Sequence, residues 1–388
     1  MTVQELFENT FGLSAETTSF APGRVEFIGN HTDYNGGDVM GVAIDKGVFI
    51  AASKREDDEI HMVSTISDEV VMRRLSCLEK PLEGNNSWTN YPIGVICSLL
   101  KRDFNLPTGF NIAVASNLPV GAGLSSSAAI ELSTLHAIMQ LNGFDISKAD
   151  MARIGRQSEN EYVGIPSGIL DQGTSSFGKE GSIIYINCKE EDFSVLATGK
   201  KLSLWIFNTD HKHSLVDSLY GQRHQECSEA FDYFKKLNPD LESICDLNLE
   251  VLQEHENNIS LNMFKRTRHV ITEHRRVHAV KEALIESDLN RVGKLLLGSH
   301  RSSQHDFENS IPELDFLVDT LIQQEGVLGA RLSGGGFGGA VMALTVDSFE
   351  SSQAEKVAEA YKDKFGENRQ TTFFNTYASD GPRSIQSL

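Results

Sequence analysis

A glycine- and serine-rich turn directly follows the alternating segment 110–116 (FNIAVAS). It runs Gly121-Ala122-Gly123-Leu124-Ser125-Ser126-Ser127, and a helical pattern begins at once. Glycines let a backbone approach a ligand closely, and free amides at a helix start attract anions. A serine hydroxyl there can ligate Mg²⁺ on bound phosphates. The turn therefore indicates a phosphate-binding loop, although a serine-capped helix is the alternative and needs only one of the serines.

A second polar stretch, APGRVEFIGNHTDYNGG, spans residues 21–37. Between glycine turns it holds Arg24, Glu26, Asn30, His31 and Asp33. Short polar side chains near glycines suit a small polyol, because each sugar hydroxyl needs both a donor and an acceptor. An Asx-rich surface turn is the alternative interpretation.

Two acids lie in SENEYVGIPSGILDQ, residues 158–172. Glu159 falls near the end of an expected helix, and Asp171 follows two glycines. One carboxylate can hold Mg²⁺ while the other accepts a proton from a substrate hydroxyl. Taken alone, either acid is more often a solvated side chain or a helix cap.

A glycine loop near the C-terminus, in GARLSGGGFGGAVMAL, includes Gly334, Gly335 and Gly336 and matches G-x-G-x-x-G. That pattern binds dinucleotides only where a strand precedes it and a helix follows. Here residues 340–346 are continuously apolar and predict a buried strand. The sequence therefore excludes a dinucleotide site and leaves the purpose of the loop open.

The composition limits the class of protein. A net charge of −19 over 388 residues argues against a nucleic-acid or anionic-membrane partner. Five scattered cysteines predict unpaired thiols in a reducing compartment. Without a signal-peptide pattern or a membrane-spanning apolar run, we expect a cytoplasmic protein, monomeric or weakly dimeric.

The pattern along the chain predicts two α+β domains, residues 1–198 and 199–388. Strands are expected in 41–53, 59–75, 110–116 and 202–209. A helix is expected from Ser126 to a stop at Asn142-Gly143, and another from a capping-box pattern at 147–150 to about Tyr162. Three further helices are expected at roughly 217–237, 263–287 and 312–325.

These motifs, in this order, resemble the GHMP kinases. LPVGAGLSSSAA is similar to their ATP-phosphate loop, and LSGGGFGGAVMAL to their third motif. GRVEFIGNHTDYNGG resembles the galactokinase signature G-R-V-N-L-I-G-E-H-T-D-Y-N-x-G, and SGILDQ resembles C-G-I-M-D-Q. The resemblance implies a ribosomal protein S5-like N-terminal domain and a ferredoxin-like C-terminal domain. It also implies a site for sugar and MgATP in the cleft between them.

The resemblance assigns roles residue by residue. Asp171 would be the catalytic aspartate at the anomeric hydroxyl of galactose, with Arg24 beside it. Ser127 and Glu159 would hold Mg²⁺, and residues 121–127 would bind the ATP phosphates beneath the third loop at 334–336. The sugar would be bound by His31, Asp33 and Tyr220, together with Glu26 and Asn30.

Two positions depart from the family pattern. Asn30 stands where galactokinases have a glutamate that contacts the 6-hydroxyl, and Glu26 stands where they have asparagine. Residues 26 and 30 share a face of a regular strand, so Glu26 can substitute in part. Alternatively, loss of the carboxylate admits an acidic sugar such as galacturonate. Three functions therefore stay open: a galactose 1-kinase, a 1-kinase for a related sugar, and a non-catalytic sugar and ATP sensor.

Overall fold

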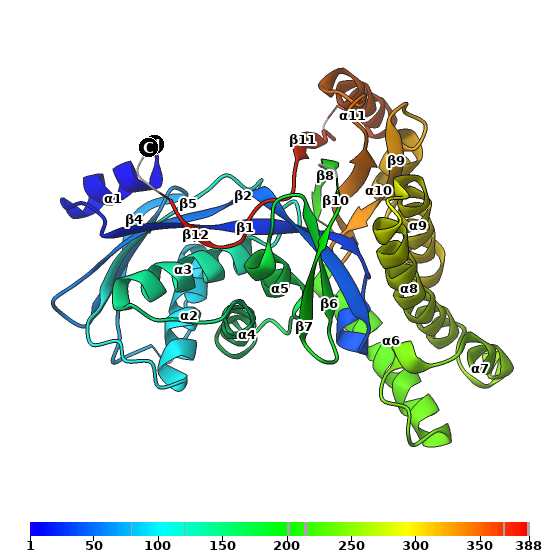
Figure 1. Cartoon of the computed structure of the whole chain (residues 1–388), viewed down its shortest axis with the longest axis horizontal. Coiled ribbons are helices and arrows are strands. Elements are labelled where there is room, and N and C mark those ends of the chain that lie inside the picture. Colours follow the sequence, from blue (N-terminus) through cyan, green and yellow to red (C-terminus); the bar gives the residue numbers. More distant parts are fainter. Residues whose placement is uncertain (79, 120, 200–201, 213–215, 368, 386–388) are drawn as a thin grey trace.

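The computed structural model describes residues 1–388 except 79, 120, 200–201, 213–215, 368 and 386–388. Two β-sheets lie in different parts of the elongated molecule, one built mainly from the N-terminal half and one from the C-terminal half (Figure 1). Such separate mixtures of strands and helices confirm the expected α+β class.

The first sheet has the strand order β12-β1-β2-β5-β3-β4, with β6 beside β2 and β7 beside β6. Only the β3–β5 pairing is parallel among the described strands. The strands are β1 (Thr17–Ile28), β2 (Asp38–Lys54), β3 (Glu59–Ser64), β4 (Ser67–Arg74), β5 (Phe110–Ser116), β6 (Ser182–Asn187), β7 (Asp192–Ala197) and β12 (Arg383–Ser384).

Helices of the first half cover this sheet, and α3 packs against both β1 and β2. Its buried face includes Ala128, Leu132 and Leu135, as the helical period predicts. The helices are α1 (Val3–Phe11), α2 (Asn90–Lys101), α3 (Ser126–Asn142), α4 (Lys148–Gln157) and α5 (Leu170–Phe177), with short helical turns at Asp33–Asn35, Gly84–Thr89 and Ser158–Val163.

The second sheet is antiparallel, in the order β11-β8-β10-β9. Its strands are β8 (Ser203–Lys212), β9 (Val327–Ser333), β10 (Gly338–Thr345) and β11 (Thr372–Thr376). The helices are α6 (Val216–Leu237), α7 (Leu249–Glu254), α8 (Leu261–Ile285), α9 (Leu289–Ser302), α10 (Pro312–Leu321) and α11 (Ser351–Phe365), with short turns at Ile244–Asp246, Glu256–Asn258 and Ser303–Phe307.

Helix α9 packs very closely on β9. A Cβ added at Gly293 would lie 2.0 Å from the carbonyl oxygen of Leu328, so only glycine fits there. This contact fixes β9, and through it the glycine loop that follows Ser333.

The C-terminal segment returns to the first sheet. Ala378 forms an isolated bridge with Ile44, and Arg383 and Ser384 of β12 pair with Phe20 and Ser19 of β1. The segment appears in Figure 1 as the red trace crossing from β11 to β12. The chain therefore crosses between the two sheets twice, once after β7 and again after β11.

The expected strands and the helix at 126–142 are confirmed, but other expectations were wrong. Helices α1, α2, α7, α9 and α11 were not predicted, although the apolar residues of α1 and α9 follow a clear helical period. The helix predicted from 147 to about Tyr162 is α4 up to Gln157 and continues as a π-helical turn at 158–163. Ser147 caps the start of α4, but the reciprocal bond that would complete a capping box is absent. The helix predicted to 325 ends at Leu321.

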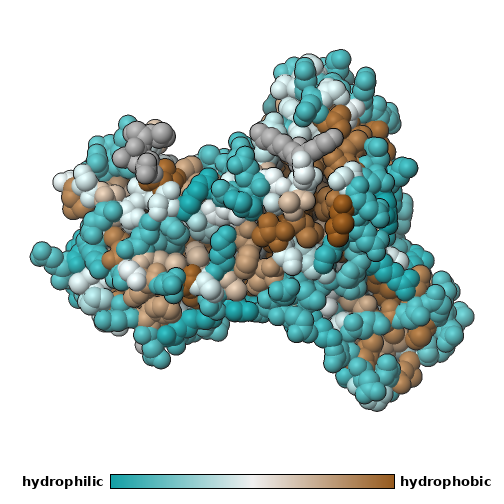
Figure 2. All heavy atoms as spheres, in the orientation of Figure 1, coloured by the Kyte–Doolittle hydropathy of each residue, from teal (hydrophilic) through white to brown (hydrophobic). Residues whose placement is uncertain are grey.

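The visible face in Figure 2 is mostly hydrophilic, with smaller hydrophobic areas between charged side chains. Among the described residues, no helix combines the length and the apolar character needed to span a bilayer. All five cysteines are unpaired, as expected.

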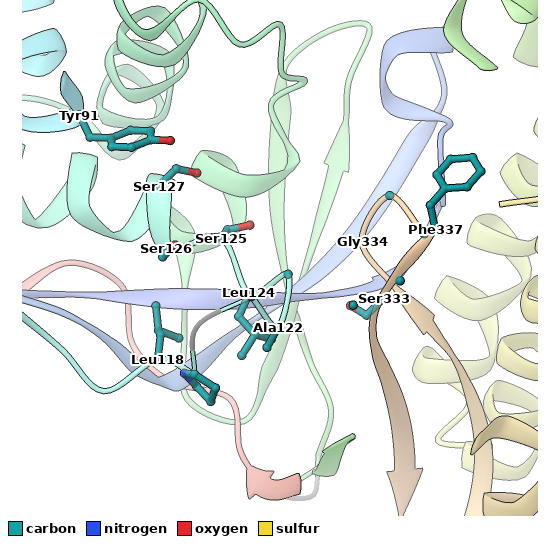
Figure 3. Close-up of a pocket in the computed structure, with 17 residues that line it drawn as sticks. Tyr91, Leu118, Ala122, Leu124, Ser125, Ser126, Ser127, Ser333, Gly334 and Phe337 are labelled. Atoms are coloured by element: carbon teal, nitrogen blue, oxygen red, sulfur yellow. The ribbon is translucent and has the colours of Figure 1, made fainter. Parts of the chain in front are cut away.

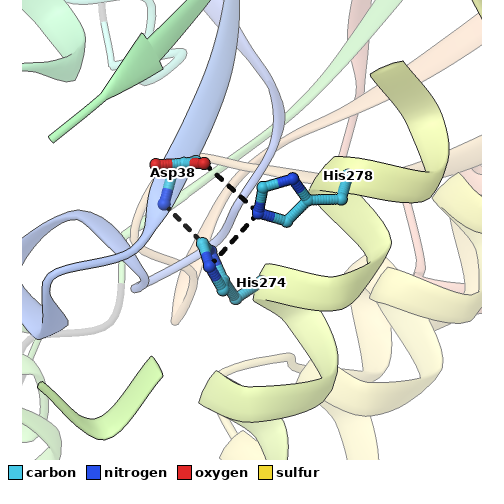
Figure 4. A group of neighbouring side chains, drawn as sticks. All are labelled: Asp38, His274 and His278. Carbon is cyan, nitrogen blue, oxygen red and sulfur yellow. Dashed lines mark hydrogen bonds and ion pairs between the residues drawn. The ribbon is translucent and has the colours of Figure 1, made fainter. Parts of the chain in front are cut away.

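Asp38 on β2 meets His274 and His278 on α8 (Figure 4). The backbone N–H of Asp38 donates to Nδ1 of His274, so the proton of neutral His274 sits on Nε2. Nε2 of His278 lies 3.2 Å from Nε2 of His274 and 3.3 Å from the Asp38 carboxylate. The single Nε2 of His278 can accept from His274 or donate to Asp38, but not both, and the cluster links β2 to α8.

Candidate active site

Two adjoining cavities contain the residues that the sequence motifs single out. One, of about 570 Å³, we call the polar cavity; the other, of about 470 Å³, we call the glycine-loop cavity. Both are within the usual range for small-molecule sites. The polar cavity is lined by the predicted residues Arg24, Glu26, Asn30, His31, Asp33, Glu159, Asp171 and Tyr220. The glycine-loop cavity is lined by residues 121–127 and 334–336, and Gly334 and Gly335 reach both.

Figure 3 shows how the glycine-loop cavity is built. Ser125, Ser126 and Ser127 lie at the start of α3 on one side, and Ser333, Gly334 and Phe337 lie on the other. The start of α3, which packs on the first sheet, therefore faces the loop between β9 and β10 of the second sheet across one cavity.

Strand β1 carries Arg24 and Glu26 on one face, since they lie two residues apart. Its pairing with β2 is regular at residues 24–26, but shifts in register flank this stretch, between Pro22 and Arg24 and between Glu26 and Ile28. Such bulges bend a strand and re-aim its side chains. Here the two bulges lie on either side of Arg24 and Glu26, whose side chains line the polar cavity.

Arg24 and Asp171 form the centre of the site. Nε and Nη2 of Arg24 lie 2.7 and 2.6 Å from the same oxygen of Asp171. Arg24 Nη1 also donates to the carbonyl oxygen of Gly123, and the Ser125 hydroxyl donates to the other Asp171 oxygen. Hydrogen bonds and an ion pair thus connect Asp171, Arg24 and the candidate phosphate-binding loop.

Ser125 decides between the two interpretations of the serine-rich turn. It is the N-cap residue of α3, with a left-handed backbone at φ 52°, yet its side chain makes no capping hydrogen bond. Its hydroxyl bonds Asp171 instead. The first amides of α3 are therefore left without a side-chain cap, which is the arrangement that binds anions and not the simple capped helix.

Glu159 lies in a group of buried acids. Gln172 Nε2 donates to Glu159 at 2.8 Å and to Glu131 at 3.0 Å, and the hydroxyl of Ser167 also donates to Glu159. Burial and the charge of Asp171 raise the Glu159 pKa, against the opposing effects of Ser167, Gln172 and Ser127. Burial and Glu159 raise the pKa of Glu131 well above its ordinary value. A cation beside Ser127 and Glu159 would relieve this accumulation of acids.

His31 is held as a neutral imidazole. Nε2 donates to the carbonyl of Gly335 at 3.1 Å, and Nδ1 accepts from the Tyr34 hydroxyl at 2.9 Å. Burial, with the nearby charge of His269, lowers the His31 pKa to about 3. Tyr220 from α6 lies against His31, with ring centroids 5.3 Å apart. Neutral and aromatic groups thus form one wall of the polar cavity.

Asp33 is the half-buried acid of this wall. Burial raises its pKa to about 7, and the neighbouring carboxylates of Glu26 and Asp171 act in the same direction. A carboxyl group poised in this way can donate or accept a hydrogen bond at neutral pH.

The third glycine loop is tied to the signature residues through its carbonyls. Gly334 O accepts from Asn30 Nδ2, and Gly335 O accepts from His31 and from Asn309. Gly336 has φ 82°, and a Cβ there would lie 2.2 Å from the Asn309 carbonyl oxygen. The loop needs glycine both for its backbone conformation and for this close approach. Its purpose is therefore to form a wall common to both cavities.

Glu26 and Asn30 contact each other directly, with Asn30 Nδ2 2.9 Å from Glu26 Oε1. The sequence argument assumed a regular strand through both residues, and that assumption was wrong. Strand β1 ends at Ile28 after a register shift, and Asn30 belongs to the turn that follows. The turn, not the strand period, brings the two side chains together.

Several residues of the site were not found from the sequence. Arg331 is fully buried and pairs with Glu26 at 2.9 Å. Glu273 of α8 accepts hydrogen bonds from the backbone amides of Gly29 and Asn30. Although burial raises the Glu273 pKa, Arg276, His269 and Arg331 lower it to about 2. Arg331 could have been identified from the sequence, because it is a charged residue within the apolar pattern of β9. No local sequence pattern identifies Glu273.

Comparisons with known proteins agree with this geometry. Family models described as the galactokinase galactose-binding signature, the GHMP kinases N terminal domain and the GHMP kinases C terminal match residues 5–54, 90–179 and 280–367. A galactokinase of Streptococcus mutans is 38% identical over 94% of each chain. One of Limosilactobacillus fermentum is 35% identical, covering 99% of this chain and 100% of the relative.

Solved structures show the same relationship. Lactococcus lactis galactokinase, crystallised with galactose, matches with a TM-score of 0.92 at 30% identity over 99% of both chains. A mevalonate kinase matches with a TM-score of 0.65 at 19% identity, covering 94% of this chain and 99% of the other, which shows the fold alone. With its two-domain GHMP kinase fold and its full-length similarity to these enzymes, the chain belongs to the galactokinases of the GHMP kinase family.

Proposed function

We propose that the protein transfers the γ-phosphoryl group of ATP to the anomeric hydroxyl of D-galactose, giving α-D-galactose 1-phosphate and ADP. The observation that carries this proposal is the Arg24–Asp171–Ser125 contact. Asp171 and Arg24 line the polar cavity, Ser125 lines the glycine-loop cavity, and the Ser125–Asp171 hydrogen bond joins the two. An acceptor hydroxyl at Asp171 therefore lies next to phosphates held by the loop.

The residues then divide the work. Asp171 accepts the hydrogen bond, and finally the proton, of the sugar hydroxyl. Arg24 orients Asp171 and adds positive charge where phosphoryl charge develops. The amides of residues 121–127 bind the phosphates, and His31, Asp33 and Tyr220 bind the sugar. Phosphoryl transfer needs this positioning and charge neutralisation more than covalent assistance.

Ser127 and Glu159 are suited to hold Mg²⁺. A hydroxyl and a carboxylate are the oxygen ligands that this ion prefers beside substrate phosphates. Burial and the charge of Asp171 raise the Glu159 pKa, and a cation there would offset this concentration of negative charge. When bound, Mg²⁺ neutralises charge on the phosphates.

The family and the charge of the chain also support a proposal for its localisation and oligomeric state. We propose a cytoplasmic enzyme, a monomer or weak dimer, with the two domains divided near residue 198. The net charge of −19 gives it no general attraction for nucleic acid or anionic membranes.

The test is ADP release with MgATP and galactose, galacturonate, N-acetylgalactosamine, arabinose or glucose. We expect turnover with galactose, and Asp171→Ala should abolish it while ATP still binds. Turnover only with another sugar would reassign the substrate. ATP and sugar binding without turnover in the unaltered protein would identify a sensor and overturn the proposal.

A further inference from the structure

The polar cavity is lined by Glu26, a carboxylate that stands where galactokinases have asparagine. We propose that Glu26, held by Arg331, is the side chain that recognises the sugar hydroxyl on the far side of the ring from the anomeric carbon. Asn30, in this proposal, positions Glu26 and does not bind sugar. The inference rests on the proposed galactose phosphorylation and adds the residue that selects a neutral sugar.

Asn30 has no hydrogen-bonding capacity left for a ligand. Its Nδ2 donates to Glu26 Oε1 at 2.9 Å and to Gly334 O at 2.8 Å. Its Oδ1 accepts from Asn309 Nδ2 at 2.8 Å and from Ser303 Oγ at 3.3 Å. An amide side chain offers two donor hydrogens and two acceptor lone pairs, so all four are used. The side chain is also only 1% exposed.

Glu26 is in the opposite situation. Oε1 accepts from Asn30 and from Arg331 Nη2. Among the described residues, no donor is paired with Oε2, and that oxygen is not one of the inaccessible polar atoms. Because Glu26 lines the polar cavity, Oε2 is the oxygen available to a ligand there.

Arg331 fixes the direction of this carboxylate. It is fully buried on β9, and it donates from Nη1 to the backbone carbonyl of Glu26 and from Nη2 to Oε1. The backbone N–H of Glu26 also donates to Oγ of Ser333, which lies on the same strand as Arg331. Oε1 is therefore held by Arg331 Nη2 and by Asn30 Nδ2, while the second guanidinium bond fixes the Glu26 backbone, and together these bonds restrict rotation of the carboxylate. Glu26 is thus presented by one sheet and oriented by the other.

The position of Glu26 sets which part of the sugar it reads. Arg24 and Glu26 are two residues apart in a regular stretch of β1, about 7 Å along the strand. That separation is comparable to the width of a hexose. With the anomeric hydroxyl at Asp171 beside Arg24, the opposite edge of the ring reaches Glu26. A carboxylate accepts from a hydroxyl there and repels a second carboxylate.

The test compares kcat/KM for galactose, 2-, 4- and 6-deoxygalactose and galacturonate in the unaltered protein, Glu26→Gln and Asn30→Ser. Glu26→Gln should lower kcat/KM for galactose roughly ten- to hundredfold, which corresponds to the loss of a hydrogen bond to a charged group. For one of the two sugars 4-deoxygalactose and 6-deoxygalactose, the loss of kcat/KM should be far smaller, because that sugar lacks the hydroxyl that Glu26 recognises. The preference for galactose over galacturonate should shrink. In Asn30→Ser the ratios between the sugars should change in the same direction as in Glu26→Gln but by less, because Arg331 still orients Glu26.

Glu26→Gln leaves the Arg331 cation buried without its partner, so the Glu26→Gln/Arg331→Met pair, which removes both charges, is measured beside it. Equal losses on every sugar in both variants would overturn the inference, as would a changed sugar ratio in Asn30→Ser alone. Sugar affinities measured by titration calorimetry separate the two proposals. If the unaltered protein binds but does not phosphorylate these sugars, the proposed function fails while the role of Glu26 is still decided by binding.

Discussion

Two nitrogens of Arg24 lie 2.7 and 2.6 Å from one oxygen of Asp171, while the other oxygen accepts from Ser125. One acid is therefore bonded to a strand of the first sheet and to the start of α3. The arrangement orients the carboxylate toward the polar cavity before any ligand binds, which is how preorganised sites reduce the cost of reorganisation.

Asp171→Asn should lower kcat by about 10²- to 10⁴-fold, the usual contribution of a positioned general base. The amide has nearly the same shape, so ATP affinity should be unchanged. Steady-state ADP release and nucleotide titration measure the two effects. Ser125→Ala, which removes a single hydrogen bond to the same acid, is the matched control and should lose much less. A loss as large as that of Asp171→Asn would contradict the assigned roles.

The two buried acids Glu159 and Glu131 should behave differently. Glu159→Gln should weaken activation by Mg²⁺ by about 10- to 100-fold, the cost of altering a metal-site residue. Glu131 is fully buried and lines neither cavity, so Glu131→Gln should change the Mg²⁺ dependence little. Initial rates over a Mg²⁺ titration distinguish them. Equal effects of both substitutions would mean that Glu159 acts only as part of the packed network.

Gly336 and Gly339 offer a matched pair, because both have φ 82°. Alanine at Gly339 meets nothing within 4 Å and should cost only the left-handed backbone strain, about 1–2 kcal/mol. Alanine at Gly336 collides with Asn309 and should cost about 1–3 kcal/mol more. Chemical unfolding measures both. Gly336→Ala should also weaken turnover, and similar unfolding free energies for the two variants would count against the close contact.

Asp33 should make stability depend on pH in the unliganded protein. Its folded pKa is about 7 against an ordinary 3.8, so the folded state binds the extra proton between these values. Stability from this group is therefore full below pH 4 and is lost as pH rises toward 7. The unfolding free energy of Asp33→Asn, relative to the unaltered protein, should rise across that window on the order of 1–2 kcal/mol. Asp145→Asn, at an exposed position, should show no such trend.

Sequence alone predicted much of the site, because its chemistry is carried by short contiguous motifs. Residues 121–127, 334–336 and the signature around His31 all line the two cavities. The strand at 110–116 and the helix at 126–142 were also predicted, since clear alternation or period and a glycine stop mark them.

What the sequence did not reveal depends on contacts between distant segments. The Arg331–Glu26 pair joins residues 305 positions apart, and Glu273 reaches Gly29 across 244. No local pattern encodes such pairs. The four hydrogen bonds that saturate Asn30 were equally hidden, because two of them come from Ser303, in the helical turn Ser303–Phe307, and from Asn309, in the loop that follows it.

The pairing of β12 with β1 has a consequence for folding during synthesis. A chain that emerges N-terminus first completes β1 and β2 long before residues 383–384 exist, so the outer edge of β1 stays open in the meantime. An unpaired strand edge is a template for aggregation. In the finished molecule β12 covers this edge at Ser19 and Phe20, and the Arg383 guanidinium sits over the Phe20 ring at 4.4 Å. Nascent chains lacking this strand should therefore depend on chaperones more than the complete protein does.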